Sequence, residues 1–315
     1  MLEVKNISKF YGNKMAIQDI SFVVEPGQIV GLLGHNGCGK STTMNIITNC
    51  LAPSEGEVLL DGVSVAEHPI AVKSRIGYLP EVPPLYPDMT VEEQLTYACG
   101  LRRILRKAHR EQIDTVCDYL NITGVRRRLI GNLSKGYRQR VGFAQALIGN
   151  PELLILDEPM SGLDPQQIIE LRELIVRLKK EHMLILSSHI LSEIAATCDR
   201  VIVLSNGHLT ADDTLSGLVG RLSDNTELVL EADGLPAQII PLIRSIPYVE
   251  DCRVETSLLN GGTEYHILIK EQKDIHRELF ECLANAHCPI RVLRPVHANL
   301  EDVFLQLTQD RRYLA

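Results

Sequence analysis

The feature that most constrains this chain is a short glycine-rich loop between two predicted elements. The apolar run 29–33 precedes the loop and predicts a buried strand, and residues 43–47 predict the start of a helix. Between them lies the sequence Gly34-His35-Asn36-Gly37-Cys38-Gly39-Lys40-Ser41-Thr42. Its spacing is G-x-x-x-x-G-K-[ST], in which backbone N–H groups surround phosphate oxygens and the helix N-terminus adds partial positive charge. The chain is therefore expected to hold a phosphate group between a strand and a helix.

The residue types in this loop suit phosphate binding. Gly34, Gly37 and Gly39 are expected to supply positive φ angles and a close backbone approach that a Cβ atom would block. Lys40 would reach the β- and γ-phosphates of a nucleotide, and the hydroxyl that follows it, Ser41, would bind Mg²⁺. The alternative is a glycine-rich turn with an exposed lysine, which the flanking strand and helix disfavour.

Cys38 lies inside this loop and close to the predicted helix N-terminus. A helix N-terminus stabilises a thiolate, so the pKa of the Cys38 thiol could be lowered and the residue could be reactive. Upstream, Tyr11 lies in a predicted turn between two alternating segments. Its ring could stack on a nucleotide base, or it could pack on a neighbouring strand.

Length and composition bound the class of protein. At 315 residues the chain has room for two domains and a sizeable core. Apolar residues make up 45% and charged residues 23%, which is typical of globular chains. The net charge of −8 argues against a nucleic-acid-binding surface over the whole chain, and no nucleic-acid partner is expected. No apolar run reaches the ~18–20 residues that span a bilayer and no signal peptide is visible, so we expect a soluble cytoplasmic chain.

Basic residues nevertheless gather locally. Three clusters occur in a segment with helical periodicity, namely Arg102-Arg103, Arg106-Lys107 and Arg126-Arg127-Arg128. These clusters could bind phosphate or anionic lipid headgroups. They could equally form a solvated helix face without a ligand.

Acidic residues follow a second apolar run, and a histidine follows a third. The run 153–156 shows no polar alternation, which predicts a parallel strand buried on both faces, and it ends in Asp157-Glu158. Parallel sheets bind ligands at the carboxyl ends of their strands, where Asp157 could hold Mg²⁺ through water and Glu158 could polarise an attacking water. The run 183–186 leads to His189, a candidate γ-phosphate contact at the same edge. Taken alone, the acids could be a helix cap with a solvated neighbour, and the histidine a structural residue.

A second anion site is predicted at a helix start. Residues 90–150 change to helical periodicity, beginning with a capping box at Thr90, and predict a helical subdomain. Ser134 is a natural N-cap within it, and together with the Gly136 N–H it could hold a γ-phosphate presented by another molecule. The alternative is an ordinary capped helix. Asp164 is the expected N-cap of a further helix.

The composition shifts near residue 223, which divides the chain into predicted domains 1–222 and 223–315. The second part predicts the order β-α-β-β-α-β, a small ferredoxin-like α+β domain. A docking or regulatory module is favoured there, because its histidines lack metal-ligand spacing: His266, His276, His287 and His297. Residues 300–307 predict an amphipathic helix that packs back onto a domain.

Five motifs in a fixed order make the chain resemble the nucleotide-binding subunit of an ABC transporter. They are the phosphate loop, Leu-Ser-Lys-Gly-Tyr, Leu-Asp-Glu-Pro, Ser-Gly-Leu-Asp and Ser-Ser-His, and the resemblance covers about residues 1–222. It implies an α/β P-loop NTPase core with an antiparallel β subdomain and a helical subdomain. It also implies ATPase activity with ATP and Mg²⁺ as cofactors.

The resemblance assigns roles by position. It puts the adenine-stacking aromatic at Tyr11, Walker A at 34–42, and the magnesium-sensing loop at Glu81. It puts the signature motif at Ser134 and Gly136, Walker B and the catalytic base at Asp157 and Glu158, the D-loop at Asp164 and the switch histidine at His189.

The resemblance also implies partners. In this family ATP lies between the Walker A of one nucleotide-binding domain and the signature of another, so a second ATP-binding subunit, identical or different, is expected. The loop at Glu81 couples to a separate multi-spanning membrane permease, which implies a peripheral position at the cytoplasmic face of the cell membrane.

Two departures from the family pattern narrow the resemblance. Glu81 stands where glutamine is usual, so its charge would raise metal affinity, and Lys135 and Tyr137 replace the commoner residues of the signature. With the small C-terminal domain, they resemble the ATPase subunits of bacterial two-component exporters of drugs, antibiotics, polysaccharides or lipids, including gliding-motility relatives. The alternative is a soluble ABC ATPase acting on a macromolecule or in regulation. Such proteins usually carry paired ATP domains or a long coiled-coil insertion, and neither is visible.

Overall fold

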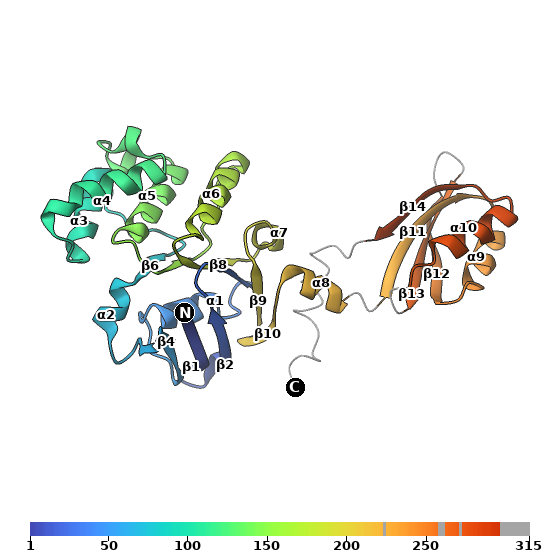
Figure 1. Cartoon of the computed structure of the whole chain (residues 1–315), viewed down its shortest axis with the longest axis horizontal. Helices are drawn as coiled ribbons and strands as arrows, with labels where there is room; N and C mark the ends of the chain where they lie inside the picture. Colours follow the sequence, from blue (N-terminus) through green and yellow to red (C-terminus); the bar gives the residue numbers. More distant parts are fainter. Residues whose placement is uncertain (223–224, 258–261, 271–272, 297–315) are drawn as a thin grey trace. The chain divides into compact units, whose positions relative to one another are not determined.

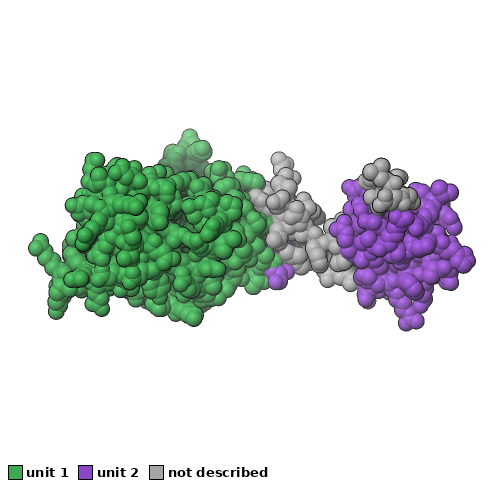
Figure 2. All heavy atoms as spheres, turned by 90° about the horizontal axis from the view of Figure 1, so that it is seen from above, with its two compact units in different colours: residues 1–215, 307–315 green, residues 216–306 purple. Residues whose placement is uncertain are grey.

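The computed structural model describes residues 1–222, 225–257, 262–270 and 273–296. These residues form two compact units, Met1–Leu215 and the described part of Ser216–Gln306 (Figure 2). The sequence predicts a division after residue 222, whereas the compact units divide at the start of helix α8 (Leu215–Leu222). The amphipathic helix predicted at residues 300–307 lies outside the described residues.

The first unit contains a small antiparallel sheet built from alternating apolar and polar residues. Its strand order is β2-β1-β4-β5. The bounds are β1 Leu2–Tyr11, β2 Lys14–Val24, β4 Glu55–Leu60 and β5 Val63–Ser64. Strand β4 begins at Glu55, which pairs with Ser8 of β1.

The second sheet of this unit has six strands in the order β10-β9-β3-β8-β7-β6. Strands β6, β7, β8, β3 and β9 run parallel, and a hairpin adds β10 antiparallel to β9. The bounds are β3 Ile29–Leu33, β6 Ile76–Leu79, β7 Leu153–Leu156, β8 Met183–Ser188, β9 Arg200–Ser205 and β10 His208–Asp213. All residues of β3, β7 and β8 are buried, as their unbroken apolar runs predict. The carboxyl ends of these three strands meet at one edge of the sheet.

Helix α1 (Lys40–Ile47) joins the two sheets of the first unit. Its Met44, Ile46 and Ile47 share one hydrophobic core with side chains of both sheets, including Ile17 of β2 and Ile185 of β8. This packing fixes the helix against β3. It therefore also fixes the loop that connects them.

The helical subdomain predicted at residues 90–150 is present (Figure 1). It contains α3 Val91–Leu101, α4 Arg106–Tyr119 and α5 Lys135–Leu147, with 3-10 turns at Thr123–Val125 and Ile130–Asn132. Thr90 forms the predicted capping box with Glu93, and Ser134 and Asp164 cap α5 and α6 (Pro165–Leu178) as predicted. The remaining short helices are α2 Pro69–Ser74 and α7 Leu191–Ala195. No helix among the described residues has the length and apolar character needed to cross a bilayer.

The second unit has the element order β-α-β-β-α-β that the sequence predicts. Its four strands lie in the order β12-β13-β11-β14. The bounds are β11 Asn225–Asp233, α9 Pro236–Arg244, β12 Val249–Ser257, β13 Gly262–Lys270, α10 His276–Asn285 and β14 Ile290–Val296. Alternate residues of β11 and β13, such as Leu230 and Tyr265, form a core with Ile239 of α9 and Leu279 of α10. The helices therefore cover one face of the sheet, and the other face carries charged residues such as Glu264 and His266.

Candidate active site

The glycine loop connects β3 to α1 as the sequence predicts, but the helix begins at Lys40 rather than Thr43. Gly37 and Gly39 have φ angles of 84° and 113°, where a residue with a side chain would be strained. Gly34 is not in the positive-φ region, which corrects one expectation. Its role is close packing, because a Cβ atom there would lie 2.4 Å from Cys38 Sγ and 2.5 Å from the Leu204 carbonyl oxygen.

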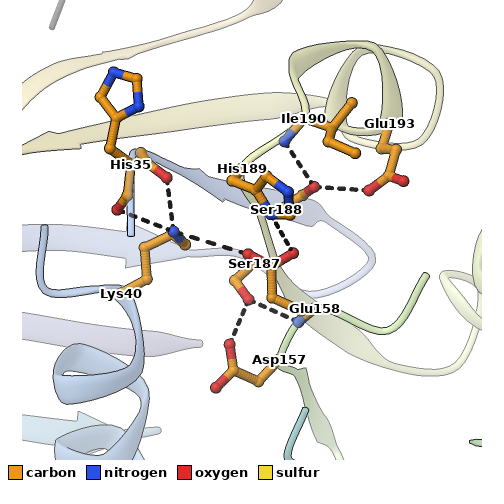
Figure 3. Close-up of polar contacts among 10 residues, drawn as sticks. His35, Lys40, Asp157, Glu158, Ser187, Ser188, His189, Ile190 and Glu193 are labelled. Atoms are coloured by element: carbon orange, nitrogen blue, oxygen red, sulfur yellow. Dashed lines mark hydrogen bonds and ion pairs between the residues drawn. The ribbon is translucent and has the colours of Figure 1, made fainter. Parts of the chain in front are cut away.

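Lys40 is buried rather than exposed, so the alternative of a surface lysine in a simple turn is wrong. Its side chain is 6% exposed. The ammonium donates to the carbonyl oxygens of Gly34 at 2.6 Å and His35 at 3.3 Å, and lies 3.8 Å from Glu158 Oε1 (Figure 3). A buried cation aimed into its own glycine loop is suited to a phosphate group, since it could exchange these carbonyl contacts for phosphate oxygens.

Asp157 and Glu158 follow β7 and are tied to β8 by one serine hydroxyl. Ser187 Oγ donates to Asp157 Oδ1 at 2.6 Å and accepts from the Glu158 N–H at 2.9 Å (Figure 3). The Asp157 N–H donates to the Leu79 carbonyl of β6 at 2.8 Å. Ser187 is fully buried, and sequence analysis gave it no role. Its position at the end of an apolar parallel strand is the signal that could have singled it out.

Glu158 and His189 meet across the ends of β7 and β8. His189 Nδ1 lies 2.9 Å from Glu158 Oε2, while the other carboxylate oxygen faces Lys40 (Figure 3). Glu158 has φ 46°, a left-handed conformation that is unfavourable for a glutamate. Strained backbone of this kind is concentrated at functional sites. The three predicted residues Lys40, Glu158 and His189 are therefore brought together in one cluster.

A second serine holds the backbone beside His189. Ser188 Oγ donates to Glu193 Oε2 at 2.7 Å and accepts from the Ile190 N–H at 3.0 Å (Figure 3). Glu193 is 9% exposed and lies on α7. The sequence does not predict this contact between Ser188 and Glu193, because a hydroxyl next to a histidine does not by itself indicate which carboxylate it contacts.

Several known proteins are similar to this chain in sequence. The chain matches the ABC transporter family over residues 17–161. It is 31% identical to the linearmycin resistance ATP-binding protein LnrL of Bacillus subtilis (strain 168), over 98% of either chain. The chain belongs to the ABC transporter ATP-binding proteins. It is also 31% identical to the bacitracin transport ATP-binding protein BcrA of Enterococcus faecalis, over 98% of this chain and 96% of that protein.

A solved structure of the ATP-binding subunit of an ABC transporter has the same core fold. It superposes with a TM-score of 0.65 at 32% identity, covering 70% of this chain and 92% of that one. As a member of this family, the chain binds ATP and hydrolyses it to power a transporter. The expectation of a P-loop ATPase subunit is thereby confirmed.

The residues predicted for the signature motif, Ser134 and Gly136, lie at the start of α5 in the helical subdomain. Ser134 is exposed at the start of α5, and its Oγ accepts from the Tyr137 N–H at 3.4 Å. Gly136 is buried under Gln167, whose Oε1 would lie 2.3 Å from a Cβ atom at Gly136. Figure 1 shows α5 among the helices of this subdomain and apart from α1.

Most of the other predicted residues are exposed. Tyr11 is 53% exposed at the end of β1, with Lys9 Nζ 5.6 Å from its ring centroid. Glu81 is exposed just after β6, the strand next to β7. Ser41 is exposed in the first turn of α1, and Asp164 is exposed where its carboxylate accepts from the Gln167 N–H at 2.9 Å. Of three further loop residues, His35 and Asn36 are exposed and Thr42 is half-buried.

The expectation of a low pKa for Cys38 is wrong. The side chain is 6% exposed, and burial raises the pKa of the Cys38 thiol, although the neighbouring Lys40 ammonium lowers it in part. Desolvation of a thiolate outweighs the nearby positive charge and the helix N-terminus here. The thiol is therefore protonated near neutral pH and packs against Gly34.

In the second unit, strand pairing brings Glu255 of β12 close to Glu264 and His266 of β13. Glu255, Glu264 and His266 offer side-chain atoms that all lie within 4.8 Å of one another. His266 Nε2 lies 2.5 Å from Glu255 Oε2 and 3.6 Å from Glu264 Oε1. The spacing of the histidines alone could not indicate this group. The contacts of His266 with both carboxylates account for this group without a metal.

Proposed function

We propose that two ATP-binding subunits associate head to tail, so that each ATP lies between the glycine loop of one chain and Ser134 and Gly136 of the other. The observation that carries this proposal is the cluster of Lys40, Glu158 and His189, with contacts of 3.8 and 2.9 Å. The cluster holds the groups needed on one side of a triphosphate. The exposed N-terminus of α5 offers an anion site to a second molecule.

In this proposal Glu158 is the general base for hydrolysis. Its carboxylate lies between the Lys40 ammonium and His189, and its backbone N–H is fixed by Ser187. A carboxylate held in this way can accept a proton from a water aligned on the γ-phosphate. Lys40 then neutralises charge on the phosphate oxygens, and His189 orients the Glu158 carboxylate and contacts the γ-phosphate.

Mg²⁺ would be held by Ser41, Asp157 and Glu81, whose hydroxyl and carboxylate oxygens are the donors this ion prefers. When bound, Mg²⁺ would offset the negative charge of the phosphate oxygens. Ser187 already donates to Asp157 Oδ1 at 2.6 Å, which would orient the carboxylate for this role. The remaining assignments, Tyr11 for the adenine ring and Asp164 for the subunit contact, rest on the family resemblance, and both residues are exposed.

The relatives named for linearmycin resistance and bacitracin transport support an exporter that acts on antibiotics of this kind. We propose a separate multi-spanning permease as the partner and a position at the cytoplasmic face of the cell membrane. A groove of about 250 Å³ between the core and the helical subdomain is the proposed docking site. Its apolar lining includes Tyr78, Ala98 and Leu101, and Leu101 is 67% exposed.

The proposal is tested with the Glu158→Gln variant of the full chain. Glutamine keeps the shape of the side chain but cannot accept the proton, so hydrolysis should fall by about 10²–10⁴-fold. ATP binding should persist, and an ATP-dependent dimer should accumulate in size-exclusion chromatography with light scattering. Glu173→Gln, on the exposed part of α6, is the matched control and should hydrolyse normally. Hydrolysis by Glu158→Gln at the wild-type rate would refute the assignment.

A further inference from the structure

A basic cavity in the helical subdomain has no part in the ATP site. It encloses about 480 Å³ between α3, α4 and the segment that follows the 3-10 turn Thr123–Val125. Four of its lining residues are arginines, Arg106, Arg110, Arg126 and Arg127. The concentration of positive charge contrasts with the net charge of −8 for the whole chain. The sequence alone is compatible with either an anion site or a solvated face at such clusters.

The carboxylates around the cavity do not balance its arginines. Arg126 is held by Asp114 and by Glu92, with 3.0 Å to Glu92 Oε1. Arg110 shares the same Asp114 at 3.8 Å. Among the described residues, Arg106 and Arg127 make no ion pair with a carboxylate. Two carboxylates therefore face four arginines, and both of them contact Arg126.

The start of α4 adds to this imbalance. The helix begins at Arg106, has no acidic residue in its first turn and receives no side-chain hydrogen bond at its N-cap, Leu105. Its first residues are instead basic, Arg106 and Lys107. The N-terminus of a helix carries partial positive charge, so basic residues there are unfavourable unless an anion offsets them. Arg106 and His109 of this first turn both line the cavity.

We propose that this cavity binds the phosphate group of an anionic ligand, either a phospholipid headgroup or a free phosphate compound. Planar guanidinium groups form two parallel hydrogen bonds to phosphate oxygens, and Arg106 and Arg127 are available for this geometry. Arg126, fixed by its two carboxylates, supplies a third and immobile charge at the same cavity. The site is distinct from the glycine loop, which lies before α1.

Full-length Arg106→Gln/Arg127→Gln and a matched control, Arg103→Gln/Arg128→Gln, test the proposal. The control removes the same charge from exposed residues of the same subdomain that do not line the cavity. In the lipid arm, sedimentation with phosphatidylcholine vesicles is compared with and without phosphatidylglycerol. In the free-phosphate arm, pyrophosphate is titrated calorimetrically into protein whose nucleotide site is filled with ADP.

Loss of the Arg106 and Arg127 guanidinium groups should weaken binding of the probe by about tenfold or more. The control variant should weaken it by no more than about twofold. A selective loss in the vesicle arm identifies a lipid headgroup, and a selective loss in the pyrophosphate arm identifies a free phosphate compound. Both double variants should hydrolyse ATP at the wild-type rate, which verifies the fold. Equal losses in the two variants, or no binding of either probe to the wild-type chain, would overturn the proposal.

Discussion

At the scale of single residues, the site depends on side chains whose charges and hydroxyls constrain one another. Glu158 has the left-handed φ of 46°, and Ser187 holds its N–H while also donating to Asp157. A left-handed non-glycine residue costs on the order of 1–3 kcal/mol, so the surrounding hydrogen bonds must hold its backbone in this conformation. The cost is consistent with a residue placed for chemistry rather than for stability.

Cys38 gives a prediction at the same scale. Because burial raises the pKa of its thiol, iodoacetamide should modify the exposed Cys50 first and Cys38 only slowly at neutral pH. The neutral thiol is favoured in the fold, so its contribution to stability is present below the ordinary pKa of a free thiol. That contribution is lost as the pH rises through the raised pKa of Cys38. Peptide mass spectrometry across a pH series measures both labelling rates, and faster labelling of Cys38 than of Cys50 at pH 7 would contradict the burial argument.

At the scale of elements, the local pattern was sufficient for the strands and caps around the site. The apolar runs of β3, β7 and β8 and the caps at Thr90, Ser134 and Asp164 follow from local periodicity and capping chemistry. The hydrogen-bond partners that hold the site residues in place do not follow from local sequence patterns. The surroundings of Cys38 include the Gly207 N–H, which donates to its carbonyl from a hairpin far along the chain.

Other contacts depend on strand pairing, which local sequence patterns do not reveal. The hydroxyl of Ser187 reaches Asp157 only because β7 and β8 are neighbours in the sheet. Glu255 reaches His266 at a register shift between β12 and β13. A one-residue irregularity moves side chains between faces of a sheet, and periodicity alone does not locate it.

The capping box of α3 provides a prediction at the element scale. Thr90→Ala removes the side-chain acceptor for the Glu93 N–H and should cost about 1 kcal/mol of local helix stability. Amide hydrogen exchange at the start of α3 should accelerate by about fivefold. Thr96→Ala, a matched change in the same helix whose hydroxyl donates only to the Glu92 carbonyl, should leave that exchange unchanged or slower. Equal acceleration in both variants would show that the cap has no special role.

At the scale of the whole molecule, the two compact units have separate hydrophobic cores. One core joins α1 to both sheets of the first unit, and the other joins α9 and α10 to the sheet of the second. The glycine loop, Glu158, His189 and Ser134 all belong to the first unit. The proposed composite site therefore requires the first units of two chains. The question to test is whether Ser134 of one chain completes the ATP site at the glycine loop of another.

Mixing two inactive variants answers this question. Lys40→Ala removes the ammonium from the glycine loop, and Ser134→Arg blocks the start of α5. In a head-to-tail dimer, the loop of the Ser134→Arg chain meets the intact Ser134 of the Lys40→Ala chain, so each mixed dimer contains one complete site. An equimolar mixture should recover about a quarter of the wild-type specific activity, because half of the dimers are mixed and each has one of two sites.

A second mixture controls for simple dilution or stabilisation. Lys40→Ala and Glu158→Gln impair the same half of the composite site, so mixed dimers of these chains leave both sites defective. Phosphate release should stay at the level of the separate variants in this mixture. Recovery in both mixtures, or in neither, would mean that Ser134 does not complete the site of a second chain. Recovery in the first mixture alone requires the two halves to come from different chains, because neither inactive variant can repair its own defect.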